Sequence, residues 1–255
     1  MRPGRVGRRE SVAFVVRRDT HGTGRPGAGQ SGAGQSVAVS PDGKTVYAAG
    51  SAGPSLTSPA GDFSLAVAYR ATGTQKWASR YAGPAGGYAA GFQIVVGPGG
   101  GAVYVGANAW NSAHDVTIAT LAYRAATGRR SWLNRVGGGT PSIAVTPDGR
   151  TVIATGPRAS TYGIAAYDAS TGKTRWTRAA PVTGMFPSGL VIDPRSSTAY
   201  IGGDRLAAYS VATGKLLWIA SGFPHGSIFG RSADGARLFG AGWNGHSVIT
   251  VAYRS

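Results

Sequence analysis

Two short segments combine aromatic, amide and imidazole side chains in a way that could bind a ligand. Trp110 lies in the stretch NAWNSAHD at 108–115, and Trp243 lies in the stretch GWNGH at 242–246. An indole beside asparagine and histidine offers a stacking surface together with hydrogen-bonding groups, which suits sugars and peptides. The alternative is that both indoles pack against neighbouring strands.

Other segments at equivalent places in the chain supply more polar candidates. All of them break the regular repeat described below, and we expect them to gather on one face of the fold. The candidate ligand-binding residues are Trp110, Asn111, His114, Asp115, Arg158, Tyr162, Asp204, Arg205, Trp243, Asn244 and His246.

The histidines show no metal-binding spacing. They stand at His21, His114, His225 and His246. A zinc or copper site needs three convergent ligands whose geometry is supported by neighbouring groups, and only loops could bring three of these together. The sequence therefore predicts no metal site.

Signatures of catalysis are also missing from the sequence. The chain has no cysteine and no G-x-S-x-G motif, and Glu10 is its single glutamate. A glycosidase that uses paired glutamates is therefore excluded, and paired aspartates would have to come from loops, such as Asp115 and Asp204. The glycines at 97–101 precede no helix, so they form a turn and not a phosphate-binding loop. We predict no catalytic residue.

The charge is strongly basic. Lys and Arg number 26 against 10 Asp and Glu, which gives a formal net charge of +16. Such a balance can indicate a polyanion partner such as nucleic acid or an anionic surface. Outside the first 25 residues, however, the arginines are scattered along the sequence, often beside turns. This scatter favours a solvated surface over a dedicated basic face.

The elements that must position these candidates form an internal repeat. Four segments match closely: AYRATGTQKW at 68–77, AYRAATGRRSW at 122–132, AYDASTGKTRW at 166–176 and AYSVATGKLLW at 208–218. A fifth, AYRS, occupies 252–255. Between them recurs a second pattern, apolar run, Pro-Asp-Gly turn, apolar run, as in VAVSPDGKTVYAAG at 37–50. This pattern is typical of a β-hairpin.

The repeat predicts one fold. Four antiparallel strands per unit, repeated at about 42–55 residues, indicate an all-β protein, a β-propeller of about five blades. The aromatic residues that recur in each unit are assigned to packing within and between blades. They are Tyr69, Trp77, Tyr123, Trp132, Tyr167, Trp176, Tyr209, Trp218 and Tyr253.

The ends of the chain suggest how the ring closes. The fifth unit has three strands, and the run SVAFVVRR at 11–18 resembles a lone strand. We expect this strand to complete the last blade, which removes an exposed sheet edge; the alternative is an open propeller. The predicted divisions are a disordered basic tail at 1–10, a closing strand with a glycine-rich connector at 11–34, and the propeller at 35–255.

The segment AYDASTGKTRW resembles the pyrroloquinoline-quinone-type (PQQ-like) β-propeller repeat, in which a Thr-Gly turn precedes a Trp that docks between blades. Over residues 35–255 the chain is similar to secreted bacterial propeller proteins with this repeat. A quinone dehydrogenase of this type would imply calcium beside the quinone and a catalytic aspartate. The acidic residues here stand singly in or near turns, whereas calcium needs six to eight oxygen ligands. We therefore expect no cofactor, PQQ included.

The sequence favours a non-catalytic binding or scaffold module whose loop face takes a protein or carbohydrate-like ligand. Two alternatives remain: a propeller-type enzyme, either a lactonase-like hydrolase or a quinone or metal oxidoreductase, and polyanion binding through the arginine-rich surface. The apolar stretch at 12–16 is too short for a signal peptide, and no run reaches the roughly 20 residues of a transmembrane helix. The resemblance suggests secretion, and we expect a monomer.

Overall fold

The computed structural model describes residues 31–53, 61–139, 141–158, 161–182, 189–193, 197–220, 225–232, 236–243 and 246–254. These residues form 19 strands, and no helix occurs among them. The strands assemble into five antiparallel sheets, four of four strands and one of three. In every sheet, strands that follow one another in the chain lie side by side, which is the order of a propeller blade.

Each sheet is one blade. The first strand of each four-stranded blade is the innermost and the last strand is the outermost. Blade 1 contains β1 (Ser31–Val39), β2 (Thr45–Gly53), β3 (Phe63–Arg70) and β4 (Gln75–Tyr81). Blade 2 contains β5 (Tyr88–Val96), β6 (Ala102–Trp110), β7 (Val116–Arg124) and β8 (Arg130–Gly137). Blade 3 contains β9 (Ser142–Val145), β10 (Thr151–Arg158), β11 (Thr161–Asp168) and β12 (Thr174–Ala180). Blade 4 contains β13 (Leu190–Asp193), β14 (Thr198–Gly202), β15 (Leu206–Ser210) and β16 (Leu216–Ala220). Blade 5 contains β17 (His225–Arg231), β18 (Arg237–Trp243) and β19 (Val248–Arg254).

The Pro-Asp-Gly turns join the first and second strands of a blade. In blade 1 the carboxylate of Asp42 accepts hydrogen bonds from the Ser40 hydroxyl at 2.6 Å and from the Lys44 backbone amide at 3.1 Å. Gly43 supplies the positive φ, 70°, that this turn requires. Asp148 binds Thr146 and the Arg150 amide in the same way in blade 3.

Tryptophans join neighbouring blades, as the repeat predicts. The indole Nε1 of Trp77 donates to the carbonyl of Ala125 at 2.9 Å, and Trp132 donates to Ala169 at 3.0 Å. Trp176 makes the same bond to Val211 at 2.8 Å. All three indoles are buried, and each acceptor belongs to the next blade. Each indole thus contributes both apolar burial and one hydrogen bond to an interblade contact.

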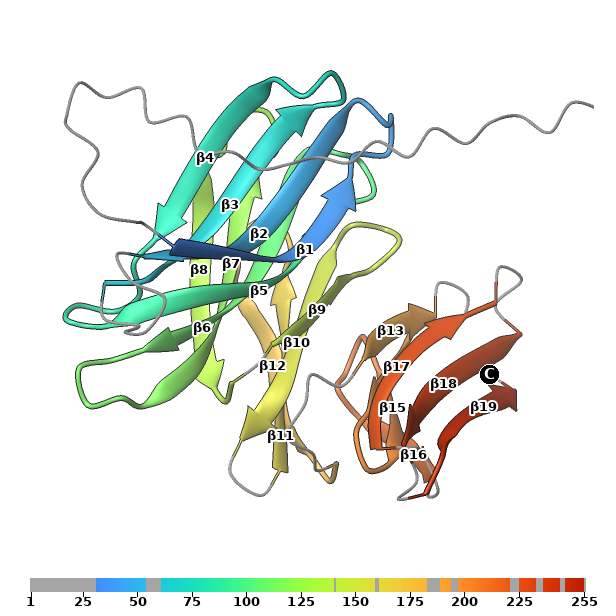
Figure 1. The fold of residues 1–255 in the computed structure, drawn as a ribbon. Helices are drawn as coiled ribbons and strands as arrows, with labels where there is room; N and C mark the ends of the chain where they lie inside the picture. The colour runs from blue at the N-terminus through green and yellow to red at the C-terminus, as the bar shows by residue number, and fades with distance from the viewer. Residues whose placement is uncertain are drawn as a thin grey trace, which may run out of the picture.

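The blades follow one another in a row from blade 1 to blade 5 (Figure 1). Their innermost strands lie in chain order, with β1 against β5, β5 against β9, β9 against β13 and β13 against β17. The first and fifth sheets stand at the two ends of this row, with the other three between them (Figure 1). The hydrophobic core consists of the layers between successive sheets.

The predicted propeller of about five blades is confirmed, and so is the three-stranded fifth unit among the described residues. One boundary differs, because β1 begins at Ser31 whereas the sequence places 31–34 in the connector. Residues 31–34 pair with the last residues of β2, so the hairpin extends to Gly53. The tail at 1–10 and the closing strand at 11–18 lie outside the described residues, and closure stays a prediction.

Candidate functional site

The hairpin that joins β6 and β7 carries a pair of stacked aromatic rings. Trp110 is the last residue of β6, and Tyr88 is the first residue of the neighbouring β5. The two residues are direct partners in the β5–β6 register. Their ring centroids lie 4.7 Å apart with an interplanar angle of 14°. Both side chains are half-buried, so part of each remains accessible.

Asn111 fixes the backbone of the loop that follows. Its side-chain Oδ1 accepts hydrogen bonds from the amides of Ala113 and Asp115, both at 2.9 Å. Its Nδ2 donates to Oδ2 of Asp115 at 3.0 Å. An asparagine that binds the backbone two residues ahead is the usual way of closing such a turn. The loop at 111–115 is therefore held in one shape by its own side chains.

His114 is the most unusual residue of this loop. It adopts a φ of 65°, one of two positive values found for non-glycine residues in the described part of the chain. The left-handed conformation disfavours residues with a Cβ, and it often marks a functional position. The imidazole is exposed, and its centroid lies 6.4 Å from that of Tyr88.

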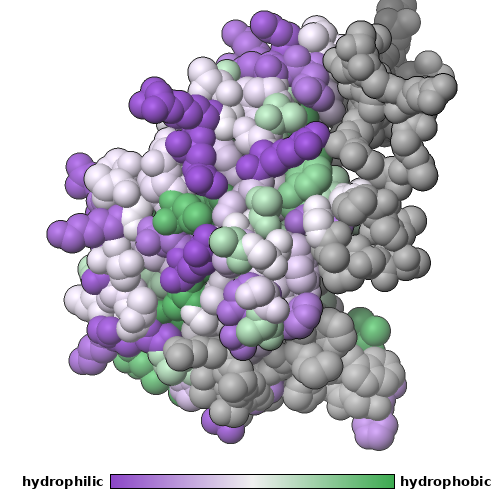
Figure 2. All heavy atoms as spheres, turned by 90° about the vertical axis from the view of Figure 1, so that its left-hand side faces the viewer, coloured by the Kyte–Doolittle hydropathy of each residue, from purple (hydrophilic) through white to green (hydrophobic). Residues whose placement is uncertain are grey.

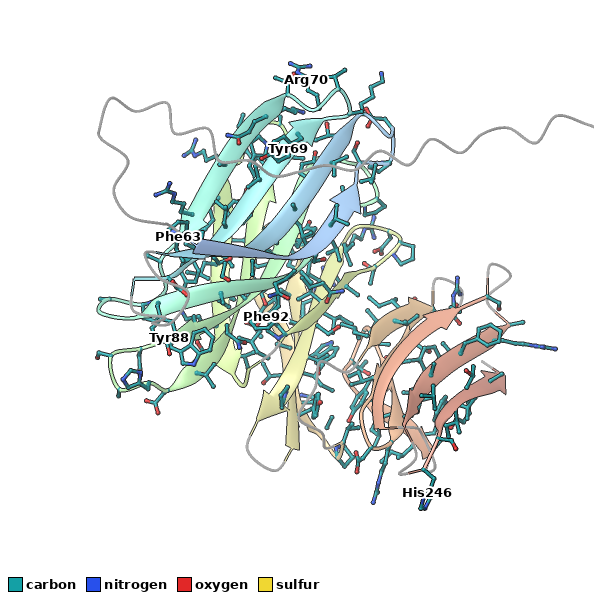
Figure 3. All side chains as sticks on the ribbon, in the orientation of Figure 1. Phe63, Tyr69, Arg70, Tyr88, Phe92 and His246 are labelled. Carbon is teal, nitrogen blue, oxygen red and sulfur yellow. The ribbon has the colours of Figure 1, made fainter. Side chains whose placement is uncertain are left out.

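These residues make a compact surface, which we name the aromatic platform: Tyr88, Trp110, Asn111, His114 and Asp115. Its stacked rings can take an apolar or planar group, and its exposed imidazole and carboxylate can donate and accept hydrogen bonds. Figure 3 labels Tyr88 near the end of this hairpin, at the left of the molecule. The platform joins four of the residues predicted from the sequence with one that was not predicted.

Tyr88 escaped prediction because it precedes the first apolar run of its blade and breaks no repeat. A signal was nevertheless present in the sequence. The connection AGPAGGY at 82–88 runs from β4 to β5 and ends on the side of the sheet where the β6–β7 hairpin ends. A tyrosine at the end of such a connection is directly opposite Trp110 in an antiparallel pair.

The other predicted residues whose side chains the structure describes do not join the platform. Tyr162 is 1% exposed and belongs to the core between blades 3 and 4, so its predicted place on a loop surface is wrong. The neighbours Asp204 and Arg205 form a weak ion pair at 3.9 Å in the β14–β15 turn. His246 is exposed at the β18–β19 hairpin, far from Tyr88 (Figure 3).

Three predicted residues are described only in part or not at all. Arg158 ends β10 and Trp243 ends β18, but only their backbone positions are described. Asn244 lies outside the described residues. The predicted face therefore spreads over several blades, and the platform on blade 2 is the one place where its members come together among the described residues.

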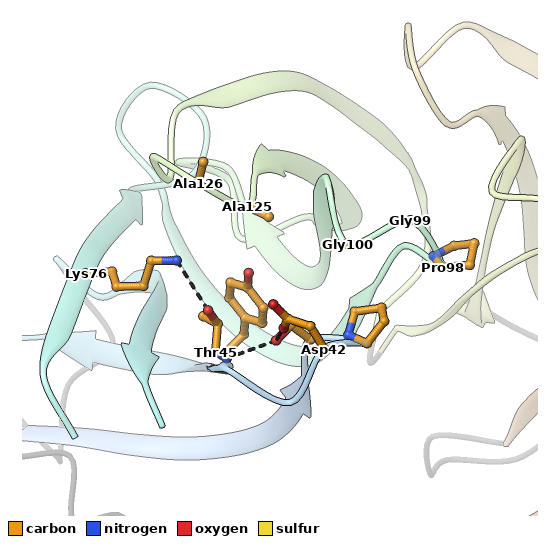
Figure 4. A pocket seen from close by; sticks show the side chains of 11 residues that line it. Asp42, Thr45, Lys76, Pro98, Gly99, Gly100, Ala125 and Ala126 are labelled. Atoms are coloured by element: carbon orange, nitrogen blue, oxygen red, sulfur yellow. Dashed lines mark hydrogen bonds between the residues drawn. The ribbon is translucent and has the colours of Figure 1, made fainter. Parts of the chain in front are cut away.

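A separate hollow of about 330 Å³ lies between the Pro-Asp-Gly turn of blade 1 and the Pro98-Gly99-Gly100 turn of blade 2 (Figure 4). Its lining includes Asp42, Thr45 and Lys76, and the Lys76 Nζ donates to the Thr45 hydroxyl at 3.2 Å. The Ser40 hydroxyl and the Lys44 amide hold the pKa of the Asp42 carboxyl below its ordinary value. Because these bonds shape the turn, Asp42 stabilises structure and is a poor general base.

Asp168 shows the same pattern more strongly. Its carboxylate accepts hydrogen bonds from the Ser170 hydroxyl at 2.7 Å, from Arg175 at 2.8 Å and from Thr171. Led by the Ser170 hydroxyl, these donors lower the pKa of Asp168 far below its ordinary value. Burial raises the pKa of the Tyr123 and Tyr167 phenols to about 12. These shifts arise from turns and packing rather than from a cleft.

The arginines of the described residues have varied surroundings. Arg175 and Arg231 pair with aspartates at 2.8 Å and 2.6 Å. The guanidinium of Arg80 lies 4.7 Å from the Phe63 ring, and Arg135 donates to the Tyr81 hydroxyl at 2.9 Å. Hydrophilic and apolar side chains are interspersed on the face shown in Figure 2. Polyanion binding through the arginines stays an alternative hypothesis.

Within the described ranges, no group of three His, Asp or Glu side chains is placed to hold a metal ion. No helix in that part of the chain is long and apolar enough to cross a membrane. The expected absence of a cofactor stays a prediction.

Comparison with known proteins identifies the fold and the family. The chain resembles the structure of "Kuenenia stuttgartiensis Hydrazine Synthase" with a TM-score of 0.57 and 13% identity, over 87% of this chain and 83% of that one. At this identity the likeness shows the fold alone. No curated protein matches the chain. Residues 61–227 match the PQQ-like repeat family described as outer membrane protein assembly factor BamB. Since this match spans well over half of the sequence, the chain belongs to that family of PQQ-like β-propeller proteins.

Proposed function

We propose that the chain is a non-catalytic binding module that holds a segment of a protein partner on the aromatic platform. The observation that carries the proposal is the stacked pair of Tyr88 and Trp110 beside the strained His114. The rigid sheet of blade 2 supports both rings, so little conformational entropy is lost when a ligand binds. Aromatic anchors of this kind dominate the energetics of many interfaces.

The chemistry of the platform suggests which segment it takes. The rings would receive one aromatic or apolar side chain, while Asp115 and His114 would accept or donate hydrogen bonds at the edge. The family description names an assembly factor, which acts on other proteins, and this supports a protein ligand over a glycan. The turn-bound carboxylates of Asp42 and Asp168 support a role without catalysis.

The proposal can be tested with a displayed library of peptides, selected on the wild-type protein. Each selected peptide is then measured against Trp110→Ala and against Trp218→Ala as a matched control. Both tryptophans are partly accessible, but Trp218 lies on β16, outside the platform. Removal of a central aromatic anchor costs about 2 kcal/mol or more, so we expect at least a tenfold loss of affinity for Trp110→Ala alone.

Two results would contradict the proposal. One is equal binding by wild type and Trp110→Ala. The other is a loss of stability of several kcal/mol in Trp110→Ala while binding is retained, because the indole would then be a packing residue. A glycan array run in parallel tests the carbohydrate alternative. Glycan binding that depends on Trp110, without peptide binding, would replace the protein ligand with a sugar.

A further inference from the structure

The two ends of the row of blades expose apolar side chains at positions where inner blades pack against one another. We name the side of blade 1 that faces away from blade 2 the back face, represented by Val37 and Val39. We name the side of blade 5 that faces away from blade 4 the forward face, represented by Phe239 and Val248. All four side chains are exposed large hydrophobics.

The back face can be compared with its counterparts in the same chain. Val37 is 66% exposed. The residues at its repeat position in blades 2, 3 and 4 are all buried against the preceding blade; they are Ile94, Ile143 and Leu190. Val37 therefore occupies an interblade position that no blade of the described residues covers.

The forward face gives the same result. Val248 is 78% exposed, whereas its counterparts Ile118 and Tyr162 are fully buried against the following blade. Phe239 is 38% exposed, whereas its counterparts in blades 1 to 4 are buried; they are Tyr47, Tyr104, Ile153 and Tyr200. Blade 5 thus presents the other half of an interblade contact.

A glycine turn on the back face supports this comparison. In blades 2, 3 and 4 a Cβ added to the Thr-Gly glycine would meet the preceding tryptophan ring within 2.7 Å; these glycines are Gly128, Gly172 and Gly214. Gly73 holds the same position in blade 1, and nothing lies within 4 Å of its added Cβ. The turn that receives an aromatic ring in the other blades is formed there, and no ring of the described residues occupies it.

We propose that a second copy of this chain covers these surfaces, with the forward face of blade 5 in one copy packed on the back face of blade 1 in the other. The two faces are complementary because the chain already joins such faces at its inner blade contacts. Contact between different surfaces of two copies forms a closed ring when the rotation allows it. Two rows would then meet at two equivalent seams.

The structure favours a second copy over closure within one chain. The first and fifth sheets stand at opposite ends of the row, with three blades between them (Figure 1). In the structure the forward face of blade 5 does not lie against the back face of blade 1, and a second copy can cover both faces. The strand predicted at 11–18 lies outside the described residues, and the proposal does not rest on it. The proposed assembly replaces the monomer that the sequence led us to expect.

The test measures the mass of the full chain in solution by light scattering over a range of concentrations. We expect the wild type to form a dimer or a larger head-to-tail assembly that dissociates on dilution. A lysine placed in the apolar seam is costly to bury, so Val37→Lys and Val248→Glu should each be monomeric while their circular dichroism stays native. Val116→Lys is the matched control, since Val116 is also exposed but lies on blade 2, and it should assemble like the wild type.

A mixture of the two variants makes the test specific. Val37→Lys and Val248→Glu place opposite charges at one seam of a mixed pair and leave the other seam unchanged, so mixing should restore assembly. Three outcomes would overturn the proposal: a wild type that is monomeric at every concentration, assembly that survives both substitutions, or variants that remain monomeric when mixed.

Discussion

Replacing Gly172 with alanine tests the interblade contact at its tightest point. Gly172 has a φ of +76°, and a Cβ added there would lie 2.7 Å from two atoms of the Trp132 ring. Trp132 is buried and donates to the carbonyl of Ala169 at 3.0 Å. The ring cannot move away without weakening that bond, so the substitution meets both backbone strain and a steric clash.

Gly73→Ala serves as a matched control that separates the cost of backbone strain from the cost of the steric clash. Gly73 has the same place in the Thr-Gly turn of blade 1 and a φ of +91°, but its added Cβ has no neighbour within 4 Å. Alanine at Gly73 should therefore cost only the strain of a positive φ, about 1 kcal/mol. Alanine at Gly172 should add about 1–3 kcal/mol for overpacking against the indole.

The assay is urea unfolding of both variants, followed by circular dichroism in dilute samples where the chain is monomeric. We expect Gly172→Ala to have a lower free energy of unfolding than Gly73→Ala by about 2 kcal/mol. Equal losses in the two variants, within about 0.5 kcal/mol, would refute the idea that the indole rests on Gly172.

Three further predictions concern the packing and the charges. Trp132→Ala should cost about 3–5 kcal/mol because a buried indole is lost, whereas Trp218→Ala, at 39% exposure, should cost far less; urea midpoints compare the two. Because the folded pKa of Asp168 is depressed, its contribution to stability is present above about pH 4 and is lost as the pH falls, so Asp168→Asn should flatten the fall in melting temperature between about pH 4 and pH 2. Arg231→Met should cost about 3 kcal/mol, because the guanidinium bonds the buried Asp193 at 2.6 Å across blades 4 and 5; a change below about 0.5 kcal/mol would contradict this.

The repeat could be recognised from the sequence because the residues that define it lie close together in each unit. The Thr-Gly turn and the Trp that follows it have a fixed spacing. The Trp docks on the next blade in blades 1 to 3, and the turn receives it in blades 2 to 4. The exposure of Trp218 could not be predicted from the sequence, because its segment matches the other units whereas its burial depends on the next blade. In the other blades the Thr-Gly turn of the next blade covers the Trp, and the described residues of blade 5 contain no such turn.

The candidate site was predictable only in part. The polar loop at 111–115 stands out because it breaks the repeat, whereas Tyr88 becomes visible only when the β5–β6 register places it opposite Trp110. The sequence assigns Tyr162 to a loop because it lies close to the junction of two predicted strands, yet β11 begins at Thr161 and places the Tyr162 ring in the core. Alternation of faces along a strand decides such cases, and a shift of one residue reverses the outcome.

The most direct test of the proposed binding role is fluorine NMR of the protein labelled with 5-fluorotryptophan. The chain has six tryptophans, and the resonance of each can be assigned by single Trp→Phe variants. Addition of a selected peptide should shift the Trp110 resonance and leave those of the buried Trp77, Trp132 and Trp176 unchanged. A peptide that binds without moving the Trp110 resonance would contradict the account.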